Sequence, residues 1–266
     1  SFYGNGGDIR DVDILNDAMR GVDCVFHLAA MWLLHCRDFP RTAFHINVEG
    51  TFNVLEACVR NKVDRLIYSS SASVYGNALE VPMREDHPFC NRNFYGVTKI
   101  AGEAMCRSFH DRYGLNYVGL RYMKVYGPHQ DQYAAYSGVI PSILNNIDAD
   151  RRPVVNGDGS QAYDFIDVRD AARSNILALQ AETTDEFYNV GTGVQTSVRE
   201  LCDLLLELRQ SDLAVSYKPY SKEDSRSLVQ NRIGCPEKAK LELGFEHRVN
   251  LREGLEHLIE WRESRA

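Results

Sequence analysis

The chain has 266 residues, 44% of them hydrophobic and 25% charged, and a formal net charge of −7. This length suits one large domain or two small ones, and the composition is that of a globular protein. The acidic balance argues against a nucleic acid or an anionic membrane surface as partner. The longest apolar stretch, residues 25–34, is too short to cross a bilayer.

Seven cysteines are scattered along the chain, an odd number with no Cys-x-x-Cys pair. Several fall within apolar strand or helix patterns, which favours reduced thiols over disulfides or metal ligands. No signal peptide is recognisable. We therefore expect a cytoplasmic protein without a metal site.

In the first half of the chain, hydrophobic periodicity predicts strands that alternate with helices. The predicted elements are strands at 22–29, 65–69 and 116–121 and helices at 42–60 and 95–112. Asn93 is the expected N-cap of the second helix. This alternation predicts an α/β fold with a doubly wound parallel sheet, whose ligands bind outside the carboxyl ends of the strands.

After residue 128 the chain becomes more polar, and its elements are shorter. We expect helices at 139–147, 198–208 and 251–261, a strand running into a helix over 165–180, and a short strand at 186–190. This pattern predicts a smaller lobe interleaved with the sheet domain. The sheet domain would comprise residues 1–128 and 164–192, and a substrate-binding lobe residues 129–163 and 193–266.

Tyr95 and Lys99 are four residues apart and share one face of the second helix. A lysine ammonium in that place favours a phenolate, so we expect the tyrosine pKa to fall from about 10 towards working pH. Ser71 ends a serine run that follows the strand at 65–69, and its hydroxyl can hold the same substrate oxygen. The Tyr/Lys spacing alone also occurs on ordinary surface helices, so the prediction depends on the serine and on the flanking motifs.

The flanking motifs are specific because of their order and spacing. They are Gly7-Asp8-Ile9-Arg10-Asp11, His27-Leu28-Ala29-Ala30, Asn47 with Gly50-Thr51-Phe52-Asn53, Ser69-Ser70-Ser71, Tyr95-x-x-x-Lys99, Arg121-Tyr122 with Val125-Tyr126-Gly127-Pro128, Gly157-Asp158-Gly159-Ser160-Gln161, and Asp164-Phe165-Ile166-Asp167. With them the chain resembles the extended short-chain dehydrogenase/reductase family, in its nucleotide-sugar epimerase/dehydratase branch. The resemblance implies a Rossmann-like sheet domain and NAD as cofactor, with NADP not excluded.

The resemblance also implies roles for residues that match the family motifs. Ser71, Tyr95 and Lys99 would be catalytic. The expected cofactor contacts are Asp8 and Ile9 at the adenine, Leu28, Ala29 and Ala30 along the dinucleotide, Lys99 at the nicotinamide ribose, Tyr122 beside the nicotinamide, and Asn47, Ser69, Tyr95 and Val125. Asp8 could instead be a solvated turn carboxylate, the alanines close packing, and Asn47 a helix-to-loop hydrogen bond.

One departure from the family concerns the cofactor phosphates. The family begins with a strand and a Gly-x-x-Gly-x-x-Gly turn, whose backbone reaches the pyrophosphate at a helix N-terminus. That turn is absent, and the glycines among residues 3–7 do not replace it because no helix follows. We expect either a segment that precedes Ser1 or a truncated gene. Without such a segment, the strand at 22–29 would form an apolar sheet edge.

Two further departures concern the substrate. Lys124 stands where the family has an asparagine that contacts the substrate diphosphate, and a lysine can bind phosphate as a point charge. Tyr163 stands in the place of an arginine. Arg226 and Arg232 are the remaining candidates for the diphosphate, although either could simply be solvated. Together with Ser71 and Lys124, they form the predicted substrate-binding set.

The expected reaction is epimerisation of a nucleotide sugar, UDP-linked, by transient oxidation at C4. Dehydratases and decarboxylases of the family carry acidic residues shortly after the catalytic hydroxyl residue, whereas Ala72 and Ser73 follow Ser71 here. An NAD(P)-dependent sugar dehydrogenase or reductase, or a decarboxylase, remains the enzymatic alternative. A dinucleotide-sensing protein or an inactive fragment is the non-enzymatic one. The resemblance suggests a homodimer through the helices at 42–60 and 95–112, although burial against the sheet explains much of the same pattern.

Overall fold

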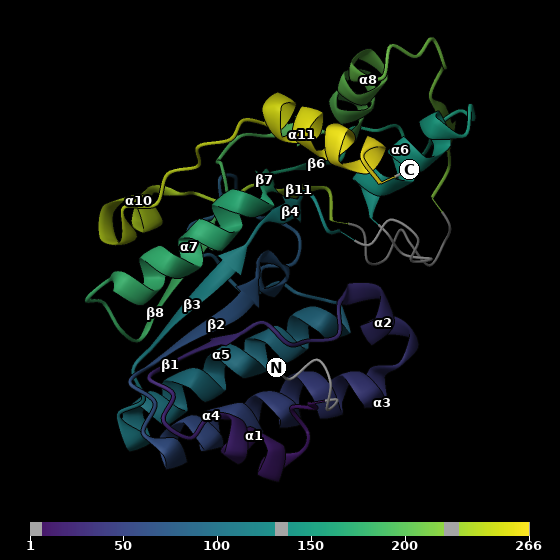
Figure 1. Cartoon of the computed structure of the whole chain (residues 1–266). Helices are drawn as coiled ribbons and strands as arrows, with labels where there is room; N and C mark the ends of the chain where they lie inside the picture. Colours follow the sequence, from purple (N-terminus) through teal and green to yellow (C-terminus); the bar gives the residue numbers. More distant parts are fainter. Residues whose placement is uncertain (1–6, 131–137, 221–228, 266) are drawn as a thin grey trace.

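The computed structural model describes residues 7–130, 138–220 and 229–265. Its centre is a parallel sheet in the order β1 (Cys24–His27), β2 (Arg65–Ser71), β3 (Tyr117–Tyr122) and β8 (Glu186–Val190) (Figure 1). Helices cover both faces of this sheet. The predicted α/β fold with a parallel, doubly wound sheet is therefore confirmed.

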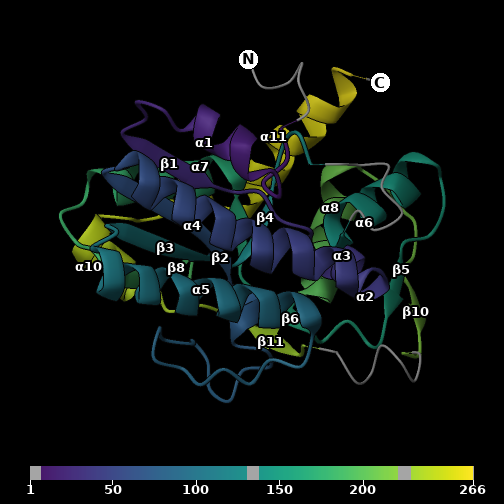
Figure 2. The same ribbon diagram turned by 90° about the horizontal axis from the view of Figure 1, so that it is seen from below.

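The two helical layers come from different parts of the chain. α4 (Gly50–Asn61) and α5 (Phe94–Tyr113) pack on one face, and α7 (Val168–Gln180) and α10 (Glu237–Leu243) lie on the other. α1 (Val12–Ala18) packs against α4 on the outside (Figure 2). Buried apolar side chains between these layers form two clusters, one on each side of the sheet.

A second cluster of elements lies beyond the carboxyl ends of the strands (Figure 1). α6 (Val139–Asp148), α8 (Val198–Leu208) and α11 (Leu251–Glu263) share a separate apolar core. Short strands surround it: β4 (Lys124–Tyr126) with β7 (Phe165–Asp167), β11 (Asn231–Arg232) with β6 (Ala162–Tyr163) and β9 (Thr196–Ser197), and β10 (Ser216–Lys218) with β5 (Val154–Asn156). The domain boundaries expected from the sequence stay a prediction.

Local capping explains where several helices begin. Asn93 accepts a hydrogen bond from the Gly96 amide, so the expected N-cap of α5 is confirmed. Ser197 with Glu200 and Asn250 with Glu253 form capping boxes at the starts of α8 and α11. These signals fix the first turns, and the apolar stripes that follow are buried in the core of this lobe.

The structure corrects the sequence-based elements in three places. The predicted helix at 42–60 starts as a short helix, α3 (Pro40–Ala43), passes through a π-helical segment (Phe44–Glu49) and only then becomes α4. The short helices α1, α2 (Leu33–Asp38) and α10 were not predicted. The strand expected at 22–29 ends at His27, and within the described residues it forms an edge of the sheet, with Phe26 39% exposed.

Candidate active site

The three predicted catalytic residues meet at the carboxyl end of β2. Ser71 is the last residue of that strand, and Tyr95 and Lys99 lie on the first turns of α5. A Cβ at Gly96 would clash with the Ser73 carbonyl oxygen, so a glycine is needed where the helix approaches the turn after Ser71. In the sheet, Ser71 is in register with Tyr122, which confirms that the chemistry candidates share one edge.

The hydroxyls of Ser71 and Tyr95 lie near each other. Burial raises the pKa of Tyr95 to about 12, and the neighbouring Ser71 hydroxyl opposes that rise. The Ser71 hydroxyl also accepts a hydrogen bond from the Ser73 amide at 3.1 Å, which fixes its direction. The expected fall of the tyrosine pKa below 10 is therefore wrong for the chain alone, because desolvation outweighs the nearby charges.

Lys99 is buried close to that tyrosine. Its Nζ lies 5.8 Å from the centre of the Tyr95 ring and donates a hydrogen bond of 2.6 Å to the Ser69 carbonyl oxygen. Burial lowers the pKa of Lys99 to about 8. The ammonium is thus oriented by the backbone of β2 and placed to stabilise a phenolate that forms during a reaction.

The predicted dinucleotide contacts after β1 form an exposed strip. Leu28, Ala29 and Ala30 are all exposed. His27, the last residue of β1, has its pKa lowered to about 3 by burial and by the charge of Lys99, so the strip begins near Lys99. An open apolar strip next to a buried ammonium fits a dinucleotide.

Asn47 lies behind this strip. Its Oδ1 accepts a hydrogen bond from the Met31 amide at 2.7 Å, and its Nδ2 donates to Thr98 Oγ1 at 3.1 Å. The side chain therefore joins the loop after β1 to α5, which is the helix-to-loop role left open by the sequence. Its contact with a cofactor stays a prediction.

The remaining cofactor candidates lie at two ends of the site. Near α1, hydrogen bonds from Arg10 lower the pKa of Asp8, and the Ile9 carbonyl oxygen accepts a hydrogen bond from Asn53. At the sheet edge, Ser69 is buried, Val125 packs against the sheet core, and the Tyr122 hydroxyl donates to Asn175 Oδ1 at 2.9 Å. These contacts with a cofactor also stay predictions.

A cleft of about 690 Å³ opens beside Asn93 and Phe94, next to Tyr95, and runs towards α6 and β5. Lys124 and Arg232 both line it, and neither has a carboxylate partner within the described residues. Lys124 Nζ lies 5.1 Å from the centre of the Tyr163 ring. Arg232 donates to Ser73 Oγ and to the Gly76 carbonyl oxygen at 3.3 and 3.4 Å.

The two cations influence each other. The surrounding protein and the charge of Arg232 lower the pKa of Lys124 to about 8. Two uncompensated positive charges in one cleft form a site for an anion. Arg226, the other predicted diphosphate contact, lies outside the described residues.

Asp164 holds these two cations in place through its backbone. Its carbonyl oxygen accepts from the Lys124 amide at 2.9 Å, and its own amide donates to the Arg232 carbonyl oxygen at 3.0 Å. Its buried carboxylate accepts from the amides of Thr192 and Gly193 at 2.8 and 3.0 Å. The sequence marked Asp164 only as part of a motif, and its position between the cations appears in the strand pairing alone.

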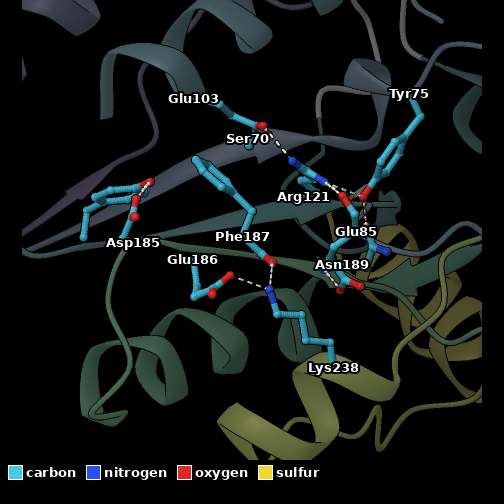
Figure 3. A network of polar contacts seen from close by, with 11 residues as sticks. Ser70, Tyr75, Glu85, Glu103, Arg121, Asp185, Glu186, Phe187, Asn189 and Lys238 are labelled. Atoms are coloured by element: carbon cyan, nitrogen blue, oxygen red, sulfur yellow. Dashed lines mark hydrogen bonds and ion pairs between the residues drawn. The ribbon is translucent and has the colours of Figure 1, made fainter. Parts of the chain in front are cut away.

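A buried polar network supports α5 from behind (Figure 3). Glu103 forms an ion pair of 2.8 Å with Arg121 and accepts from the Ser70 hydroxyl. Burial alone would lower the pKa of Arg121, but its hydrogen bonds with Glu103 raise it. Glu103 was missed by the sequence reasoning, although it follows Lys99 by four residues on the same helical face.

Among the described residues, no group of three or more His, Cys, Asp or Glu side chains could hold a metal ion, and all seven cysteines are free thiols. None of the helices in the described part of the chain is both long and apolar enough to span a membrane.

Comparison with known proteins gives consistent matches over nearly the whole chain. The model of the NAD dependent epimerase/dehydratase family matches residues 3–191. A putative UDP-glucose 4-epimerase of Methanocaldococcus jannaschii is 33% identical, over 96% of this chain and 82% of that protein. The structure of UDP-glucose 4-epimerase from Thermotoga maritima with UDP-glucose superimposes with a TM-score of 0.91, at 32% identity over 97% of this chain and 84% of that one. A dTDP-glucose 4,6-dehydratase from Streptomyces venezuelae with NAD bound gives 0.89, at 27% identity over 97% and 79% of the two chains.

Proposed function

The chain belongs to the NAD dependent epimerase/dehydratase family, and we propose that it is a UDP-sugar 4-epimerase that uses NAD. The observation that carries this proposal is the meeting of Ser71, Tyr95 and Lys99 beside a cleft with two cations that have no carboxylate partner among the described residues. The exposed strip at Leu28, Ala29 and Ala30 supports NAD as the cofactor. NADP is a second possibility, since Asp8 and Arg10 neutralise each other at the expected adenine end.

In the proposed reaction, Ser71 and Tyr95 share the oxygen of the sugar C4 hydroxyl. The Ser71 hydroxyl donates to that oxygen, and Tyr95 removes its proton as the C4 hydrogen leaves as hydride. NAD, when bound, supplies the acceptor for that hydride and returns it. Tyr95 then gives the proton back to the oxygen after the sugar has turned, which yields the C4 epimer without net oxidation.

Lys99 makes that proton transfer feasible. A hydroxyl whose pKa is raised to about 12 is a poor base near neutral pH unless a positive charge stabilises its phenolate. The Lys99 ammonium, fixed by the Ser69 carbonyl oxygen, supplies such a charge, and Arg232 also lowers the pKa of Tyr95. General base catalysis of this kind contributes about 10²- to 10⁴-fold.

We assign the substrate diphosphate to the pair Lys124 and Arg232. Tyr163 takes the place of the family arginine, and Lys124 restores a cation beside it, 5.1 Å from its ring. The pair lies at the same sheet edge as Ser71, because β4 continues directly from β3. This arrangement supports a UDP-linked substrate but does not distinguish between possible sugars.

Family siblings with other reactions are the second candidate. The similarity to a 4,6-dehydratase keeps that activity in consideration. However, Ser71 runs into a 3₁₀ turn, Ala72–Val74, that carries no carboxylate for further proton transfer. A decarboxylase meets the same objection, and a dehydrogenase or reductase would release its keto product rather than return the hydride.

A homodimer is part of the proposal. α4 and α5 present exposed apolar side chains on their outer face, with Phe52 43%, Val97 49% and Tyr113 58% exposed. Phe52 packs edge-on against Phe109, which joins the two helices into one surface. Exposed apolar side chains on this face fit contact with the same face of a second copy.

Replacement of Tyr95 by Phe tests the function. We expect turnover to fall by at least about 10²-fold while bound NAD, measured by absorbance after denaturation, stays at the wild-type level. Near-normal turnover in Tyr95→Phe would show that another group is the base. Wild-type protein that binds NAD but converts no nucleotide sugar would favour a sensing protein or an inactive fragment.

A further inference from the structure

The side chain of Gln161 leaves one hydrogen-bond acceptor unused in the substrate cleft. Gln161 is 7% exposed and lines the cleft just before β6. Its Nε2 donates to the Asn156 carbonyl oxygen at 3.0 Å, and only the amide nitrogen can make that bond, so the orientation of the amide is fixed. Its Oε1 is buried, and no described residue donates a hydrogen bond to it. The cleft therefore contains an acceptor that a ligand can pair.

The backbone of Gln161 is held firmly. Its carbonyl oxygen accepts from the Val198 amide at 2.9 Å, at the start of α8. The next residue, Ala162, donates to the Gln230 carbonyl oxygen at 2.8 Å. The backbone of Gln161 is therefore anchored on both sides, and the Nε2 hydrogen bond sets the direction of its side-chain oxygen.

Gln161 lies one step further along the cleft than the cations. Arg232 is in register with Tyr163, two residues after Gln161, so the backbone of Gln161 lies about 7 Å along the strand from the level of Arg232. Lys124 and Arg232 take the diphosphate in the proposed function, on which this inference rests. A diphosphate in a nucleotide sugar joins the sugar to the nucleoside. Since the sugar lies at Ser71 and Tyr95 in that function, the nucleoside is left for Gln161.

The surroundings of Gln161 suit a flat ring. Val155 and Val198 are buried beside it and line the same cleft. The ring of Tyr220 lies against Gly157, where a Cβ would clash with it, and its hydroxyl is also buried without a partner. Apolar walls, an aromatic ring and a free acceptor match a heterocycle that carries a ring N–H.

We propose that Gln161 Oε1 accepts a hydrogen bond from the ring N–H of the nucleotide base and thereby selects uracil or thymine over cytosine. Uracil and thymine carry a donor at N3, whereas cytosine carries an acceptor there. The Gln161 oxygen, whose direction is fixed by the Nε2 hydrogen bond, can pair with the N3–H of uracil or thymine. It cannot pair with the N3 acceptor of cytosine. A ribose hydroxyl, which can donate or accept, would give no such selection.

The test compares ligands that differ at one atom. Affinities of the NAD-loaded, full-length protein for UDP, N3-methyl-UDP, CDP and 2′-deoxy-UDP are measured by titration calorimetry. We expect UDP to bind roughly tenfold or more tightly than N3-methyl-UDP and CDP, because each of these leaves the Gln161 oxygen unpaired. In Gln161→Met, which keeps the shape, the ratio should fall to within about threefold. Ser142→Ala, on α6 in the lining of the same cleft, should keep the wild-type ratio.

The comparison uses the ratio of the affinities for two ligands, because a variant that weakens binding of all ligands equally leaves that ratio unchanged. Equal wild-type affinity for UDP and N3-methyl-UDP would overturn the inference, as would a ratio that survives in Gln161→Met. A loss confined to 2′-deoxy-UDP that disappears in Gln161→Met would show a ribose contact instead. Wild-type protein that binds UDP no better than pyrophosphate would contradict the proposed function itself.

Discussion

Lys124 replaces the asparagine of the family motif, and its positive charge can still bind a diphosphate. Its ammonium and the Arg232 guanidinium lie in one cleft, and their repulsion and desolvation favour loss of the lysine proton. The negative charge of an anionic substrate would oppose this loss by stabilising the ammonium. The pKa of about 8 places this change within an accessible range of pH.

This gives a prediction on pH. Because the pKa of Lys124 is lowered from 10.5 to about 8, its charge is complete only well below pH 8, is half lost at pH 8 and disappears above it. The affinity for a UDP-sugar should therefore fall as pH rises through 8, by up to about tenfold per pH unit. Lys124→Arg should fall less steeply over this range, since arginine keeps its proton. Titration calorimetry at constant ionic strength measures both, and identical slopes would exclude Lys124 as the cause.

Sequence reasoning at the residue scale succeeded where the chemistry follows from spacing. Ser71, Tyr95 and Lys99 meet as predicted because a strand end and the start of the next helix share one sheet edge. The tyrosine pKa was wrong because burial, which has no signature in a single sequence, raises it. Gln161 was visible as a motif residue, but its unused oxygen depends on strand pairing and on the path of the chain after Asn156.

At the scale of elements, α5 determines the geometry of the site because it carries both Tyr95 and Lys99. Its contact with the sheet is close at Gly102, where a Cβ would clash with Tyr68 Oη. Tyr68 is buried on β2, and Lys99 Nζ lies 5.3 Å from the centre of its ring. The distance between helix and strand therefore depends on the absence of a side chain at residue 102.

Replacement of Gly102 by Ala should push α5 away from β2. We expect a loss of stability of about 1–3 kcal/mol, typical of overpacking, together with lower turnover because Tyr95 and Lys99 move with the helix. Thermal unfolding and steady-state rates measure the two effects. Ser108→Ala on the exposed face of the same helix should stay within about 0.5 kcal/mol of wild type. Unchanged stability and rate in Gly102→Ala would refute the close contact.

Long periodic elements were predictable, and short ones were not. α8 has the predicted bounds, and a capping box defines its start. α1 and α10 have seven residues each, too few for a clear period. The π-helical segment from Phe44 to Glu49 contains Asn47, whose hydrogen bond to the Met31 amide is a tertiary contact that periodicity does not show.

At the scale of the whole molecule, two surfaces matter: the cleft between the sheet and the second lobe, and the outer face of α4 and α5. The cleft was predictable only as a location, the carboxyl edge of the sheet. Its cations come from β4 and β11, more than a hundred residues apart, and Asp164 connects them. The second surface followed from the apolar stripes of the two helices, and its role in assembly stays a proposal.

A charge on that face should disrupt the proposed dimer. In a symmetric dimer, Phe52→Glu would bury two carboxylates close to each other in the interface. We therefore expect this variant to be a monomer, measured by light scattering coupled to gel filtration. Ile176→Glu, at a similarly exposed apolar residue on α7, is the matched control and should leave the assembly unchanged. A dimer that persists in Phe52→Glu would place the interface elsewhere.

The central claim is that hydride leaves C4 and returns to it, with Tyr95 as the base. UDP-glucose, UDP-N-acetylglucosamine and UDP-glucuronate, each deuterated at C4, are incubated with the full-length protein, and the products are analysed by NMR and mass spectrometry. The account predicts a C4 epimer of one of them that retains deuterium at C4, with no free reduced cofactor and no product from Tyr95→Phe. Deuterium found at C6, in released reduced cofactor or in solvent, or no turnover of any of the three by NAD-loaded protein, would contradict it.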